Sequence, residues 1–195
     1  KGTTNKVAND ENLAGQVGER YTTNYKTDII GYTVDMTSLP TNANGIYKED
    51  TVEVTYYYTK NDGSIDNTDI VKTSTDTDKV IDSVNSVFGY TIDAYAEVKH
   101  YVGDVTLKVA DVLPYEIDID KSNIGNCTYN SENKTITCIK KYTITEEDYT
   151  TNNKGEKVFI IDETFTLDLA FTHVDSEIVT NNAKVEIILD DSKIT

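Results

Sequence analysis

Residues 105–111 alternate between the two faces of an extended chain, and this pattern constrains the fold more than any other in the sequence. Asp111 falls on the apolar face, in register with Val105, Leu107 and Val109. A period of two residues predicts a half-buried β-strand. Pro114 ends it, because proline cannot continue a hydrogen-bonded ladder. A carboxylate in such a register must be paired, protonated or used in chemistry.

The chain is acidic. Its 195 residues include 34 Asp and Glu against 18 Lys and Arg, for a formal net charge of −16. This charge argues against nucleic acids and anionic membrane surfaces as partners. No apolar run reaches the length of a membrane span and no signal peptide opens the chain. We therefore expect a soluble excerpt of a longer protein, with any signal and anchor outside it and no membrane contact of its own.

Short strands with turns between them recur along the whole chain, and no segment has a convincing helical period. Predicted strands or strand starts lie at 52–58, 70–73, 88–98, 105–111, 142–144, 165–171 and 181–187. This spacing predicts an all-β protein ending in a β-sandwich. The Asn-Asp-Gly turn within residues 60–69 indicates a solvated linker. We therefore expect two modules, residues 1–60 and 61–195, in a monomeric fragment.

The only two cysteines, Cys127 and Cys138, lie symmetrically about a predicted turn near 131–133. A tight hairpin would place them opposite each other, close enough to bridge. A disulfide would indicate an oxidising compartment; two free thiols are the alternative. No second pair of Cys or His ligands suits a zinc site, so no metal is expected.

Four ordered motifs in residues 1–59 resemble the mucin-binding-protein (MucBP) repeat of Gram-positive surface proteins. They are a Gly-x-Val-Gly-Glu-x-Tyr-Thr stretch, an Ile-x-Gly-Tyr stretch, an Asn-x-x-Gly-x-Tyr loop and a Val-x-Val-x-Tyr-x-Tyr strand. The family's opening strand would precede Lys1. The resemblance implies a small β-grasp-like or sandwich module, truncated at its edge. Tyr56 and Tyr58 share a strand face and are candidate glycan contacts, although such repeats often serve as spacers.

Residues 70–190 resemble the isopeptide-forming immunoglobulin-like domains of Gram-positive adhesins and pilins. The matching segments are 70–73, 90–92, 103–105 with 111–114, 128–129 with 134–137, and 180–183. One departure is visible, because the hairpin usually closes with Trp where this chain has Cys138. The resemblance implies an autocatalytic bond between Lys72 on the first strand and Asn181 on the last, promoted by the buried Asp111.

Strand phase supports these three residues. Lys72 aligns with Ile70, Asn181 aligns with Ala183, and Asp111 aligns with the apolar face of its strand. Burial depresses the pKa of a lysine and so favours the nucleophilic amine, while a protonated Asp111 could polarise the Asn carboxamide. A plain Lys–Asp ion pair with a hydrogen-bonding Asn is the alternative. If the last strand slips by one residue, Asn182 becomes the acceptor.

The sequence contains no phosphate-binding loop, nucleophile elbow or His pair for a metal, so we expect no enzyme activity beyond this cross-link and no cofactor. We expect a structural stalk of an extracellular, cell-wall-anchored adhesin. The alternative is that this fragment itself binds a host glycan, mucin or extracellular-matrix protein.

Overall fold

A computed structural model describes residues 5–76, 80–81, 83–175, 178 and 180–190. Throughout these residues the protein is built from β-strands, with one 3₁₀ turn, η1 (Glu146–Asp148), and no α-helix. The all-β prediction is therefore confirmed. None of the described segments is a helix long and apolar enough to cross a membrane.

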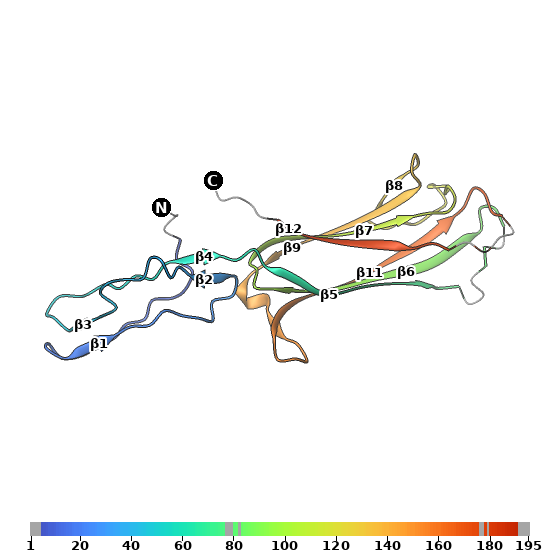
Figure 1. Ribbon diagram of the computed structural model, residues 1–195. Coiled ribbons are helices and arrows are strands. Elements are labelled where there is room, and N and C mark those ends of the chain that lie inside the picture. The colour runs from blue at the N-terminus through green and yellow to red at the C-terminus, as the bar shows by residue number, and fades with distance from the viewer. Residues whose placement is uncertain (1–4, 77–79, 82, 176–177, 179, 191–195) are drawn as a thin grey trace.

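The first module contains two small antiparallel sheets of two strands each (Figure 1). One pairs β1 (Arg20–Thr22) with β3 (Asn44–Ile46), and the other pairs β2 (Tyr32–Val34) with β4 (Tyr58–Lys60). The predicted strand at 52–58 is wrong in extent, because only Tyr58 joins a ladder. The side chains of 54–58 still alternate between half-buried and exposed, so the two-residue period reports an extended chain that joins a sheet only at Tyr58.

The second module is a sandwich of two four-stranded sheets that lie face to face in Figure 1. One sheet has the order β10-β11-β6-β5 and the other β12-β7-β9-β8. All hydrogen-bonded neighbours are antiparallel. The strands are β5 (Ser64–Ser74), β6 (Val87–Lys99), β7 (Gly103–Val112), β8 (Thr128–Asn130), β9 (Thr135–Ile144), β10 (Thr150–Thr151), β11 (Lys157–Ala170) and β12 (Ala183–Asp190).

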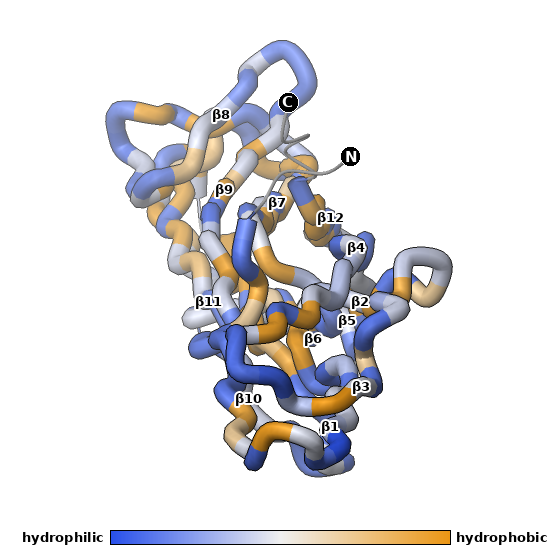
Figure 2. The backbone as a smooth tube through the Cα atoms, turned by 90° about the vertical axis from the view of Figure 1, so that its left-hand side faces the viewer, coloured by the Kyte–Doolittle hydropathy of each residue, from blue (hydrophilic) through white to orange (hydrophobic). Residues whose placement is uncertain are grey.

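Alternation along the strands builds the sandwich core. The even-numbered residues of β6 from Tyr90 to Val98 point inward and are almost fully buried, as the sequence predicts. Figure 2 shows the same pattern as hydrophobic and hydrophilic segments alternating along the tube, with a hydrophilic turn between β8 and β9. The core is contributed mainly by Ile92, Val98, Val105, Leu107, Val109, Ile136, Ile144, Ile161, Leu167 and Leu169. Asp111 is the exception, a charged side chain with 0% exposure.

The connection between the modules is shorter than predicted. β4 ends at Lys60 and β5 begins at Ser64, so only residues 61–63 lie between the strands. The prediction of a linker over 60–69 is wrong because residues 64–66 already pair with the end of β6. A bulge between Asp66 and Asp69, with Asn67 at φ 50°, accommodates the polar run inside a strand.

Tyr101, in the loop between β6 and β7, is the packing centre of this junction and is fully buried. The Nζ atom of Lys60 lies 4.8 Å from the centroid of its ring, and Gly63 lies directly against it. Its hydroxyl donates hydrogen bonds to the carbonyl oxygens of Asp104 (3.0 Å) and Asp190 (2.8 Å). Since Gly63 precedes β5 and Asp190 ends β12, the chain enters and leaves the sandwich at the same end.

Candidate functional site

The predicted Lys72 and Asp111 meet across the sandwich core. Lys72 projects from β5 in one sheet and Asp111 from β7 in the other. The Lys72 ammonium donates a hydrogen bond of 2.6 Å to Asp111 Oδ2. The carboxylate is 1% exposed and the lysine side chain 18%. An ion pair this deep stabilises little on its own, because removing both charges from water offsets most of their attraction. The pair is consistent with both predicted alternatives, a structural ion pair and a lysine placed for reaction.

Tyr90 on β6 completes this cluster, and sequence reasoning missed it. Its hydroxyl donates a hydrogen bond of 2.6 Å to the same Asp111 Oδ2 atom. Its ring centroid lies 3.8 Å from Lys72 Nζ, in a cation–π contact. A signal was available in the sequence. Tyr90 lies on the inward face of a predicted core strand, and a buried tyrosine hydroxyl needs a polar partner.

Burial has the largest effect on the pKa values of Lys72 and Tyr90. It lowers the pKa of Lys72, and the hydrogen bond and charge of Asp111 offset this only in part. Burial also raises the pKa of Tyr90, and the neighbouring Asp111 charge adds to the effect, so Tyr90 stays a neutral donor. The lysine is thus easier to deprotonate than a solvated one, which is the condition for an amine nucleophile.

Asn181 lies two residues before Ala183, the register partner of Asp111 on β12. Its Oδ1 atom is buried, as is Oδ1 of Asp111, and within the described structure neither oxygen has a hydrogen-bond partner. Asn182 is exposed, on the opposite face of the chain. The register therefore favours Asn181 over Asn182 as the residue near the cluster.

Cys127 and Cys138 form a disulfide across the β8–β9 hairpin, with their Cα atoms 4.3 Å apart. The turn falls between Asn130 and Thr135, and Thr128 pairs with Thr137, so the two cysteines are register neighbours. The predicted pairing is confirmed. A cavity of about 270 Å³ lies beside it, between β9 and β11.

Tyr56 and Tyr58 use their hydroxyl groups inside the first module. Tyr56 Oη lies 2.8 Å from Thr23 Oγ1 and donates to the Thr23 carbonyl oxygen at 2.9 Å. Tyr58 Oη accepts a hydrogen bond from the Lys26 amide. Both side chains are half-buried, whereas Tyr57 is 59% exposed. These contacts give Tyr56 and Tyr58 a structural role, and their contact with a glycan stays a prediction.

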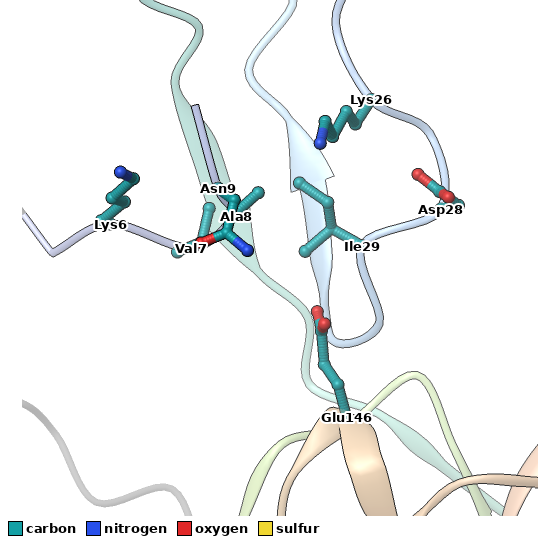
Figure 3. A pocket seen from close by; sticks show the side chains of 8 residues that line it. All are labelled: Lys6, Val7, Ala8, Asn9, Lys26, Asp28, Ile29 and Glu146. Atoms are coloured by element: carbon teal, nitrogen blue, oxygen red, sulfur yellow. The ribbon is translucent and has the colours of Figure 1, made fainter. Parts of the chain in front are cut away.

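A larger cavity, of about 460 Å³, lies where the first module meets η1 of the second (Figure 3). In Figure 3, Glu146 projects from the second module toward Ile29 of the first. The two lysines that line this cavity both form ion pairs, because Lys6 pairs with Asp10 and Lys26 pairs with Glu11. The cavity therefore offers no free cationic group to an acidic ligand. It is lined by Lys6, Val7, Ala8, Asn9, Lys26, Asp28, Ile29 and Glu146.

Comparison with known proteins gives a family match to the first module and none to the second. The family model described as the MucBP domain matches residues 1–59. The resemblance of that segment is thereby confirmed. No curated protein and no solved structure matches the chain. The resemblance of residues 70–190 to isopeptide-forming domains stays a prediction that rests on residue pattern and geometry. No cluster of three or more metal-ligating side chains occurs among the residues described here.

Proposed function

We propose that this chain is a stalk segment of an extracellular bacterial adhesin, and that its second module is locked by an isopeptide bond between Lys72 and Asn181. The observations that carry the proposal are the ion pair of Lys72 with a fully buried Asp111 and the buried, unpartnered oxygen of Asn181, which lies two residues before the register partner of Asp111. The disulfide fits the same setting, because disulfides persist in oxidising, extracellular compartments. The MucBP match of the first module favours a surface protein.

In the proposed reaction, Lys72 first passes one proton to Asp111, which leaves a neutral amine and a carboxylic acid. The amine nitrogen then attacks the Asn181 carboxamide carbon, while the acid hydrogen-bonds to the Asn181 oxygen and polarises it. A C–N bond forms to Lys72, and the bond from that carbon to Asn181 Nδ2 breaks. Ammonia leaves with the proton that Asp111 returns, and Asp111 then takes up the second proton, which the Lys72 nitrogen loses as it becomes the amide N–H. No oxidant, metal or other enzyme is required.

Intact-mass spectrometry tests this proposal. The folded wild-type chain should be lighter than its sequence by one ammonia. Lys72→Ala, Asp111→Ala and Asn181→Ala should each restore the full mass and lower the melting temperature. Asn182→Ala is the matched control, because it removes the same group from the adjacent exposed position and should keep the deficit. A full mass in the mature wild-type protein would rule out the bond and leave the ion pair as a structural contact.

The MucBP match favours a second candidate function, in which the first module binds a host mucin-type glycan. Such binding would use exposed aromatic surface, and Tyr57 offers more of it than Tyr56 or Tyr58. Titrating the full chain against immobilised mucin, with Tyr57→Ala beside the wild type, tests this function. Saturable binding weakened by Tyr57→Ala would support it, and no binding to mucin would oppose it.

A further inference from the structure

We propose that Tyr90 is a positioning residue for the cross-linking reaction, and that its hydroxyl directs the catalytic proton to Oδ1 of Asp111. This inference rests on the proposed function and adds to it a residue that does not itself form or break a bond. Tyr90 is 2% exposed, and its hydroxyl hydrogen bond to Asp111 Oδ2 is 2.6 Å long.

The two oxygens of Asp111 differ in their hydrogen bonding. Oδ2 accepts hydrogen bonds from both Lys72 and Tyr90, whereas Oδ1 is buried and accepts none among the described residues. A tyrosine hydroxyl that donates to Oδ2 favours the form in which Oδ2 is the acceptor oxygen of the acid. Lys72 delivers its proton to Oδ2, the oxygen that it contacts. A half-turn of the carboxyl group then brings the protonated oxygen to the Oδ1 position and the bare oxygen toward Tyr90 and Lys72, which is the arrangement that the Tyr90 hydroxyl favours.

In the proposed reaction the proton on Oδ1 faces the carboxamide oxygen of Asn181, and both oxygens are buried acceptors without a partner among the described residues. The proton on Oδ1 can then polarise the carboxamide while Oδ2 still holds the Lys72 amine. Without the Tyr90 hydroxyl, the acid could also carry its proton on Oδ2, between the carboxyl group and the amine. In that form the proton polarises nothing, and the lysine loses its acceptor.

Tyr90→Phe isolates the hydroxyl, since it keeps the ring over Lys72. The full chain is made by cell-free translation and quenched in denaturant at intervals, and intact mass gives the fraction that has lost ammonia. We expect Tyr90→Phe to slow this reaction by about tenfold, the factor expected for losing one hydrogen bond of about 1.4 kcal/mol. Tyr142→Phe is the matched control, because the Tyr142 hydroxyl donates a 2.9 Å hydrogen bond to Glu163 in the same sandwich.

The outcomes distinguish the role of Tyr90 from the existence of the cross-link itself. A slower reaction in Tyr90→Phe, with Tyr142→Phe at the wild-type rate, supports the assignment. A Tyr90→Phe rate equal to or above that of the wild type overturns it and leaves the cross-link standing, and so does an equal slowing in both variants. If the wild type itself never loses ammonia, the proposed function fails and the inference fails with it. Circular dichroism of each purified variant, without denaturant, verifies that every variant folds.

Discussion

Tyr101 and Tyr149 exchange two hydrogen bonds at the junction end of the sandwich. The amide of Tyr101 donates to Tyr149 Oη at 3.0 Å, and that hydroxyl donates back to the Tyr101 carbonyl oxygen at 2.7 Å. One side chain thus satisfies both backbone polar groups of a fully buried residue. Tyr149 follows η1 directly, so this exchange ties the β9–β10 connection to the loop between β6 and β7.

Replacing Tyr149 with Phe should therefore destabilise the second module by about 1–3 kcal/mol, because both hydrogen bonds between its hydroxyl and the Tyr101 backbone are lost. Urea unfolding followed by circular dichroism measures the change. Tyr57→Phe, at an exposed position, is the control and should leave the unfolding midpoint in place. An equal midpoint for Tyr149→Phe and the wild type would contradict this role.

Two glycines with nearly the same backbone conformation should respond differently to substitution. Gly63 has φ 75° and Gly155 has φ 79°, so alanine is strained at both. A Cβ at Gly63 would lie 2.6 Å from the Cβ of Tyr101, whereas one at Gly155 meets nothing within 4 Å. We expect Gly155→Ala to cost about 1 kcal/mol and Gly63→Ala clearly more. Melting temperatures of both variants decide this, and equal losses would exclude tight packing at the junction.

Reducing the disulfide should weaken the sandwich without unfolding it. The bridge spans a sequence separation of 11 residues. Closing a loop of that size lowers the entropy of the unfolded chain by an amount worth about 2–3 kcal/mol in the loop-entropy model. Urea midpoints with and without a reductant measure the loss, and a Cys127→Ala, Cys138→Val double variant should not respond to the reductant. Two thiols labelled in the denatured, unreduced protein would show that the bridge does not form.

Glu97 should make the protein less stable in acid. Burial at 6% exposure opposes its ionisation, but hydrogen bonds from Asn67, Asn152 and Tyr95 outweigh this effect and hold its pKa below 4.5. Because the folded pKa is the lower one, the ionised group stabilises the fold above about pH 4.5. This contribution is lost as the pH falls through the folded value.

The measurement is the melting temperature from pH 6 downward. Glu97→Gln should flatten the acid-side decline relative to the wild type, whereas Glu186→Gln, at an exposed side chain on β12, should not. A decline of the same steepness in wild type and Glu97→Gln would place the acid sensitivity elsewhere.

The parts of this site that the sequence predicts are those that depend on strand phase. Asp111 stands out because alternation puts a carboxylate among core residues, and the same periodicity puts Lys72 and Asn181 in inward registers. Phase cannot say which inward residues meet across two sheets, since that depends on how the sheets are stacked. The contact of Tyr90 with Asp111 Oδ2 joins the two sheets, so strand phase alone does not predict it.

The junction escaped prediction for a related reason. Asn61, Asp62 and Gly63 lie outside the strands, as the sequence predicts, but the polar residues that follow are held in β5 by pairing with β6. Local composition favours a loop there, and only the distant partner strand decides otherwise. In the first module the opposite occurs at 52–57, where strand-like residues belong to no sheet.

Gly63 packs against Leu189, so the two chain segments that border the sandwich lie at one end of it. A pull on those segments would peel β5 and β12 away pair by pair instead of shearing them along their length. With the proposed bond in place, peeling would stop at Lys72 and Asn181. Eight residue steps separate Ser64 from Lys72 and nine separate Asn181 from Asp190. At about 3.3 Å per residue this allows roughly 55 Å of extension. The sandwich would then extend under load by a fixed length, and the covalent bond would prevent any further extension.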